Sequence, residues 1–322
     1  MLPTRSSPRS GLRRSSTKAM TSVAHPASQE KATAKKRHLS WASLSAGSWF
    51  GALPFFLFVA AFLLFPVLAN LIAAFQGPGG AFSFETMAES MNAAHRPAFV
   101  LTAQLSALTA LTGAILGILL AWALQHARKP AWLNSLVNSF SALASQSGGV
   151  SLAYAFIALL GVQGFLTSFL NDLFPGLLSD FSITGFWGVT LVYLYFQIPL
   201  MAILMLPAMG GIKHQWQEAA SSLGATRWQY LRDVVFPVLW PSIIGSFLLL
   251  FANSFAAYAT AYALAGGSLN LVPILIGFYV SGNVLLNPGL AAALVTWMMA
   301  IILTAMGIRF YLTRKSDKWL SS

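Results

Sequence analysis

The chain has 322 residues, of which 57% are hydrophobic and only 8% are charged, and its net charge at pH 7 is +11. This small number of charged residues cannot cover the surface of a soluble protein of this length. The composition therefore excludes a soluble protein and favours a chain embedded in a bilayer. The sequence has no cysteine, which excludes disulfides, metal thiolates and thiol catalysis together.

Residues 1–45 are predicted to form a disordered, basic, cytoplasmic tail. The first 40 residues are rich in Ser, Arg and Lys, contain one acid, Glu30, and have no apolar core that would make them a secretory signal. A transit peptide has a similar composition, and the cluster Lys35-Lys36-Arg37 suits attraction to a lipid surface. We favour a solvated tail, or an over-long start with Met20 as the real first residue.

Six segments are long and apolar enough to cross a membrane, which takes about 20 residues. In a long apolar segment, the backbone N–H and C=O groups all find hydrogen-bond partners within the segment only if it is a helix. We therefore predict an all-α polytopic membrane protein with six transmembrane helices rather than a barrel. The predicted spans are 49–75, 98–124, 133–162, 184–210, 237–263 and 288–312. The corresponding domains are 46–97 (first span and periplasmic loop), 98–312 (core) and 313–322 (C-terminal segment).

The basic residues predict the orientation of these spans. Placing the N-terminus in the cytoplasm leaves every Lys and Arg on the cytoplasmic side except Arg96. Since Lys and Arg are retained on that side during insertion, both termini are predicted to be cytoplasmic. Nucleic-acid binding explains the net charge less well, because the charges are spread over loops and a tail rather than gathered on one face.

The insert, residues 211–237, is the one place where the chain returns to water with a helical pattern of apolar residues. Its first part places apolar side chains at i, i+3, i+4 and i+7, which is one face of a helix. These residues are Trp216, Ala219, Ala220 and Leu223. We therefore predict an amphipathic helix between two spans.

A turn and a second short helix are predicted next. Gly224 breaks the run and suits the left-handed residue that ends many helices. Thr226 and Gln229 have the spacing of a capping box, and Pro237 suits the first turn of the following helix. The second helix would carry apolar residues on one side, at Trp228, Leu231 and Val235. Periodicity leaves three interpretations open: docking of a partner, a hairpin lying in the membrane interface, and a connector packed under the bundle.

The predicted spans have no Asp, Glu, Lys or Arg near the bilayer centre. An ion-coupled carrier usually keeps such a residue, so the sequence disfavours a secondary transporter. It disfavours a channel less firmly, because neutral pores exist. A scaffold that acts only by association is a further alternative. An enzyme is excluded because the five His residues are scattered over tail and loops without metal-ligand spacing. No metal site is expected.

Polar residues inside the spans are candidates for a solute pathway, although most such groups serve as hydrogen bonds between helices. Gly148 and Gly149 in the predicted third span have no side chains, so they leave backbone polar groups accessible and room beside them. This favours their neighbours as residues of a solute pathway. The candidates are Ser145, Gln146, Tyr154, Gln197, Asn253 and Tyr258. Pro199 and Pro207 are expected to kink the fourth span.

The insert resembles the EAA loop of binding-protein-dependent ABC importer permeases. The resemblance is carried by Glu218-Ala219-Ala220, by Gly224 six positions after the Glu, and by the apolar ending Val234-Val235-Phe236-Pro237. The family pattern has Ile and Leu where this chain has Val234 and Phe236, and both replacements remain apolar. The likeness covers roughly residues 95–312 and implies the type I importer permease fold (MetI-like).

The resemblance also implies partners and roles. It implies a non-catalytic permease of the bacterial inner membrane, working with a pair of ABC ATPase subunits, a second permease that is usually a different chain, and a periplasmic solute-binding protein. No cofactor would be bound by this chain, since ATP and Mg belong to the ATPase. Glu218 would make a polar contact to the ATPase, Ala219 and Ala220 would permit close approach, and Gly224 would supply the turn. Physical inference adds Trp228 and Leu231 as anchors of the second helix.

The solute is suggested by a narrower likeness. The run Phe251–Tyr258 and the turn Gly266–Leu269 look most similar to permeases of the spermidine/putrescine class, whose relatives include thiamine, iron and aminophosphonate systems. Aromatic faces suit a polycation, but the spans offer no carboxylate to balance its charge. The outer segments 164–183 and 264–287 are expected to face the binding protein.

Overall fold

The computed structural model describes residues 46–77, 80–126, 131–176, 181–281 and 286–320. The predicted tail, residues 1–45, therefore lies outside the described residues. The chain divides into two units at Pro54, and all packing described below belongs to the second unit, from Phe55 onward.

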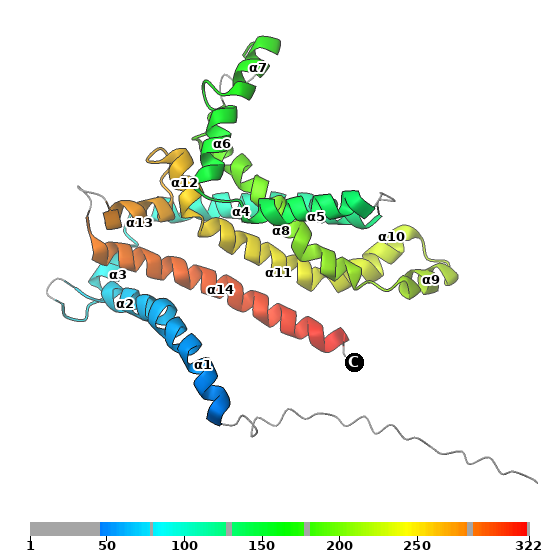
Figure 1. Ribbon diagram of the computed structural model, residues 1–322, viewed down its shortest axis with the longest axis horizontal. Coiled ribbons are helices and arrows are strands. Elements are labelled where there is room, and N and C mark those ends of the chain that lie inside the picture. The colour runs from blue at the N-terminus through cyan, green and yellow to red at the C-terminus, as the bar shows by residue number, and fades with distance from the viewer. Residues whose placement is uncertain (1–45, 78–79, 127–130, 177–180, 282–285, 321–322) are drawn as a thin grey trace, which may run out of the picture. The chain divides into compact units, whose positions relative to one another are not determined.

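The described chain is helical apart from loops and one isolated bridge between Gln76 and Phe82. Four long helices run side by side: α4 (Arg96–His126), α8 (Phe186–Gly210), α11 (Phe236–Phe255) and α14 (Pro288–Leu320) (Figure 1). The most extensive contact joins α4 and α8, and α11 packs on α4, α8 and α14. Helix α5 (Ala131–Gln146) packs on α8, and α2 (Phe65–Ala74) packs on α14.

Within the described residues, six helical segments are long and apolar enough to span a membrane, as predicted. They are Ala52–Ala74, Arg96–Gln125, Val150–Leu173, Phe186–Gly210, Arg227–Phe255 and Pro288–Leu312. The first, second, fourth and sixth agree closely with the sequence prediction. The third and fifth differ from it.

The third predicted span, 133–162, is wrong as a single helix. Helix α5 ends at Gln146, and a new helix pair begins at Val150, with α6 (Val150–Leu160) and α7 (Phe165–Leu173). In Figure 1 this pair runs steeply away from the direction shared by α4, α8 and α11. Gly149 makes the break, since its φ of +103° lies in a region that other residues rarely adopt.

The fifth predicted span, 237–263, is displaced. The expected second helix of the insert is continuous with it: α10 (Arg227–Tyr230), the π-helical turn η3 (Leu231–Val235) and α11 follow without a break. The span then ends at Phe255, and α12 (Tyr258–Ala265) is a separate helix. Pro237 lies in the first turn of α11, as predicted.

Two wide turns precede prolines. The π-helical turn η2 (Ala60–Leu64) joins α1 (Ala46–Val59) to α2. Pro66 is the second residue of α2, two positions after η2 ends. In the same way, η3 ends at Val235, and Pro237 is the second residue of the following helix, α11. A proline ring collides with the carbonyl four residues earlier in an α-helix. A widened turn that bonds residue i to i+5 relieves that collision while the helix continues.

Two further short helices of the described chain are α3 and α13. The helix α3 (Glu85–Glu89) follows the first span and packs on α14. The helix α13 (Val272–Ser281) is apolar but too short to span a membrane, and it packs between α14 and α12. The sequence predicts loops for both segments.

Close approach of backbones positions the centre of the bundle. Gly113 and Gly117 of α4 face α8, where a Cβ at position 117 would fall against the Cβ of Met201 and 2.7 Å from the carbonyl oxygen of Ile198. Alanines and methionines fill the space around them. Without a Cβ, α4 and α8 approach closely enough to pack by dispersion contacts, which drive helix association in lipid.

Candidate functional site

The first helix of the insert, α9 (His214–Ser222), ends in a complete glycine cap. Gly224 has a φ of +77°, its N–H donates to the carbonyl of Ser221 at 3.0 Å, and the N–H of Ala225 donates to the carbonyl of Ala220 at 3.0 Å. These two bonds define a Schellman motif, which satisfies carbonyls that the helix end leaves open. The prediction that Gly224 is the left-handed closing residue is confirmed.

The second helix begins with the predicted capping box. The N–H of Thr226 donates to Gln229 Oε1 at 2.8 Å, and the N–H of Gln229 donates to Thr226 Oγ1 at 3.3 Å. The box fixes the start of α10, with its N-cap Thr226 only two residues after Gly224. The turn between the two helices is therefore defined by local sequence at both ends.

The motif residues lie on the accessible side of the insert. The side chain of Glu218 is 68% exposed and stands 3.9 Å from His214 one turn earlier. Ala219 is exposed, while Trp216 and Ala220 are half-buried. Leu223 and Trp228 are 88% and 71% exposed, and Leu231 is also exposed. Because both side chains are exposed in this chain, the role of Trp228 and Leu231 as anchors of the second helix stays a prediction.

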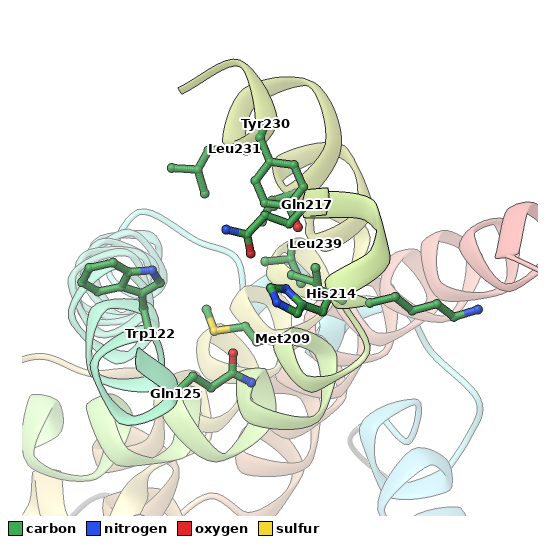
Figure 2. Close-up of a pocket in the computed structure, with 11 residues that line it drawn as sticks. Trp122, Gln125, Met209, His214, Gln217, Tyr230, Leu231 and Leu239 are labelled. Carbon is green, nitrogen blue, oxygen red and sulfur yellow. The ribbon is translucent and has the colours of Figure 1, made fainter. Parts of the chain in front are cut away.

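A groove of about 200 Å³, which we call the insert groove, lies between the insert and the ends of α4 and α8. Figure 2 shows Trp122 and Gln125 of α4 on one side, facing His214, Gln217 and Tyr230 of the insert. Met209 and Leu239 add apolar side chains to its lining. Its remaining lining residues are Ile212, Lys213, Leu231 and Val235.

The six candidate pathway residues do not form one cluster. Gln197 of α8 is fully buried, and its Nε2 donates to the carbonyl of Leu250 at 3.1 Å. Ser145 is half-buried and donates to the carbonyl of Ala142 in its own helix. Gln146, Tyr154, Asn253 and Tyr258 are exposed on the surface of this chain. Their role as a pathway stays a prediction.

Residues that the sequence did not predict as functional join the helix breaks. Tyr193 of α8 donates to the carbonyl of Ala257, which lies in the break between α11 and α12. Thr260 of α12 binds the backbone of Gly149, in the break between α5 and α6. A third bond runs from the N–H of Val272, at the start of α13, to Thr102 of α4. The available signal was the presence of Thr and Tyr hydroxyls inside apolar segments, which need partners in lipid.

The chain is similar to known membrane transport proteins. The family model described as "Binding-protein-dependent transport system inner membrane component" matches residues 113–317. The chain is 28% identical over 272 residues to the probable ABC transporter permease protein y4fN of Sinorhizobium fredii, covering 83% of this chain and 46% of that protein. It is 30% identical to the sulfate transport system permease protein CysT of Escherichia coli over 47% of this chain and 52% of that protein.

The chain is also 31% identical to the thiamine transport system permease protein ThiP of Escherichia coli, over 50% of this chain and 29% of that protein. The chain thus spans about half the length, or less, of the curated relatives it matches. Among solved structures, a bacterial ABC transporter for import of the acidic polysaccharide alginate matches with a TM-score of 0.62 and 19% identity, covering 84% of this chain and 95% of that chain. That likeness concerns the fold.

The described chain is a multi-pass helical bundle with an exposed helical insert that is closed by a glycine. The chain belongs to the binding-protein-dependent transport system inner membrane components, the permeases of ABC importers. It is therefore a non-catalytic permease of the bacterial inner membrane.

Proposed function

We propose that this chain is the permease subunit of an ATP-driven importer, in which α9 docks on a cytoplasmic ABC ATPase. The exposure of Glu218 and Ala219, with α9 closed by the Gly224 cap, carries the proposal. Small side chains at Ala219 and Ala220 allow a partner surface to approach the helix closely. The exposed side chains of Leu223, Trp228 and Leu231 supply apolar area for the same contact.

Rigid local structure lets the insert transmit motion. The cap at Gly224 and the box at Thr226 fix the angle between α9 and α10, and α10 continues through η3 into α11. A displacement of α9 by the ATPase would therefore reach α11 through an unbroken helix. ATP-driven closure can favour one pore state only by contacting the two states differently, and the proposal assigns that contact to α9.

The proposed orientation places both termini and the insert in the cytoplasm. The partners are two ATPase subunits, a second permease and a periplasmic solute-binding protein. The curated relative of which this chain covers 46% is long enough for two such units, which supports pairing of permease units. The solved alginate transporter is described in complex with a periplasmic protein, which supports the binding-protein partner.

The transported solute is proposed to be small and selected mainly by the binding protein. The sequence suggests the spermidine/putrescine class, whereas the relatives are named for sulfate, ferric iron and thiamine transport. In the described spans no carboxylate is buried that would balance a polyamine. Thiamine, iron and aminophosphonate therefore remain alternative solutes of the same system.

The coupling role is tested by energised uptake in cells that carry the full importer. Glu218→Lys and Gly224→Pro are expected to lower uptake at least about tenfold, a change of about 1.4 kcal/mol, while the complex still inserts. Asp233→Lys makes the same charge change at another exposed carboxylate of the insert and is expected to leave uptake near wild type. Wild-type uptake in both motif variants would remove the coupling role from α9.

Co-purification tests the partners and the solute. The complex released from native membranes is expected to contain an ATPase and a second permease, and the ligand of the associated binding protein names the solute. Spermidine or putrescine in that receptor supports the polyamine assignment, and another ligand replaces it. Uptake that follows an ion gradient without an ATPase would favour a secondary carrier instead.

A further inference from the structure

Three phenylalanine rings meet at the end of the first candidate span, and we call Phe75, Phe82 and Phe84 the Phe cluster. The span ends at Ala74, and Phe75 is the C-cap residue of its last helix, α2. The ring centroid of Phe75 lies 5.7 Å from that of Phe82 and 5.5 Å from that of Phe84, and the last two lie 5.2 Å apart. Phe82 and Phe84 therefore lie at the depth where the first span ends.

Hydrogen bonds hold the Phe cluster in place. An isolated bridge pairs Gln76 with Phe82. The N–H of Ser83 donates to the carbonyl of Phe75 at 2.8 Å, and the hydroxyl of Thr86 donates to the carbonyl of Gln76 at 3.2 Å. Backbone groups that leave water need such partners, because hydrocarbon offers none. These groups can therefore enter the edge of a bilayer with their hydrogen bonds intact.

The Phe cluster exposes an apolar surface that carries no charge. Phe82 is 73% exposed and Phe84 is 64% exposed in this chain. From Phe75 to Phe84 the sequence contains no Asp, Glu, Lys or Arg, and the first charged residue is Glu85. A surface that binds a soluble protein usually surrounds its apolar centre with a polar rim. An exposed apolar patch without charged neighbours in its own segment suits hydrocarbon better.

The first span presents an apolar surface up to the same point. Its most apolar stretch has no residue buried within the described chain, and Ile72, two residues before the span ends, is 60% exposed. Apolar side chains of interfacial segments reach about 5–10 Å into the boundary between headgroups and acyl chains. The distances from Phe75 to the other two rings are of this size, so hydrocarbon at the end of the span is within reach of both rings.

The Phe cluster is also attached to the sixth span. Phe75 and Met87 pack against Ala74 and against Ala292 and Ala293 of α14. The helices α2 and α3, on either side of the exposed rings in the sequence, both contact α14 (Figure 1). A contact that holds the Phe cluster therefore also holds the start of α14.

We propose that the Phe cluster inserts into the bilayer leaflet at this end of the first span and anchors the joined ends of α2 and α14 there. Phe82 and Phe84 contact the upper part of the acyl chains, and no charged headgroup is required. In the orientation proposed above, this is the periplasmic leaflet. The anchor does not depend on the identity of the solute or on docking of the ATPase.

Spin-label accessibility tests the depth of the cluster in the full importer complex in phosphatidylcholine nanodiscs. The chain has no native cysteine, so Phe82→Cys gives a single labelling site in this chain. Oxygen concentrates in hydrocarbon and a nickel chelate stays in water. The ratio of oxygen to nickel collisions is expected to be severalfold higher at residue 82 than for Glu89→Cys, an exposed position of α3. Equal ratios place residue 82 in water, and few collisions with either reagent place it under protein; either result overturns the proposal.

Photo-crosslinking keeps an aromatic ring at the site and identifies what covers it. Benzoylphenylalanine in place of Phe84 is expected to form adducts with phospholipid in the same nanodiscs. The same probe in place of Glu89 is the control and should form few lipid adducts. Adducts of position 84 with the binding protein or with a second permease, in place of lipid, overturn the proposal.

Hydrogen exchange tests the anchoring of α14. Phe82→Ser is expected to accelerate exchange of the amides at the start of α14, including Ala291, whose N–H donates to the carbonyl of Asn287. Phe165→Ser removes a ring that is 77% exposed on α7 and should leave exchange at the start of α14 unchanged. Equal exchange in the two variants overturns the anchoring.

Discussion

Thr260 and Gly149 join two interrupted helices by a pair of hydrogen bonds. The N–H of Gly149 donates to Thr260 Oγ1 at 2.6 Å, and the hydroxyl of Thr260 donates to the carbonyl of Gly149 at 3.3 Å. Helix breaks expose backbone groups that lipid cannot satisfy, so they persist only where protein groups replace the missing bonds. One side chain therefore supports the break between α5 and α6.

Replacing Thr260 by Val is expected to destabilise the protein by about 1 kcal/mol, because the isosteric side chain leaves both Gly149 groups without a partner. Thermal unfolding of the purified complex, followed by tryptophan fluorescence, should show a lower midpoint. Thr260→Ser keeps the hydroxyl and should unfold near the wild-type temperature. An unchanged midpoint in Thr260→Val would show that water or lipid serves Gly149 instead.

A substitution at Gly117 tests the close contact of α4 and α8. Gly117→Ala is expected to cost about 1–3 kcal/mol, because the new methyl group meets Met201 and the backbone of Ile198 and the helices must separate. Gly307→Ala is the matched control, since a Cβ there meets nothing within 4 Å. Its unfolding midpoint should be unchanged or higher. If the unfolding midpoints of Gly117→Ala and Gly307→Ala change by the same amount, the close contact of α4 and α8 is contradicted.

Local sequence determined much of the insert. The Schellman cap at Gly224 and the box at Thr226 depend on residues within six positions, so spacing alone predicted them correctly. The span count was also predictable, because length and hydropathy are local properties. The four-residue spacing of Gly113 and Gly117 is a local signal of the close approach of α4 to α8.

Other features depend on distant partners. The third span is broken at Gly149, whose backbone is satisfied by Thr260, 111 residues away. Its apolar composition continues across the break, so hydropathy gave no boundary there. The helix α13 reads as an outer loop, yet its first N–H is bound by Thr102 of α4. The insert groove has lining residues from α4, α8, α9 and the fifth span, which only the fold brings together.

The capping box makes a prediction about the docking insert. Thr226→Ala is expected to weaken the start of α10 by about 1 kcal/mol, because the N–H of Gln229 loses its acceptor. Amide exchange at Gln229 should accelerate about fivefold, the factor that corresponds to this free energy. Thr226→Ser retains the acceptor oxygen and should exchange like wild type. Unchanged exchange in Thr226→Ala would show that the box does not stabilise α10.

Tyr279, on α13, predicts a pH dependence outside the candidate spans. Its hydroxyl lies 2.8 Å from Nε2 of His95, and burial raises its pKa above the usual value of about 10, with the charge of Glu89 raising it further. Because the folded state favours the neutral phenol, this stabilisation is complete below the unfolded pKa. It is lost as the pH rises through the higher folded pKa.

The measurement is the ultraviolet absorbance of phenolate as a function of pH, taken as wild type minus Tyr279→Phe. The difference curve isolates Tyr279 among the eight tyrosines and should have its midpoint above the usual tyrosine range. Glu89→Gln removes the second cause and should lower that midpoint, but not to the usual value, since burial is the larger cause. A midpoint at or below the usual value would mean that α13 leaves Tyr279 open to water.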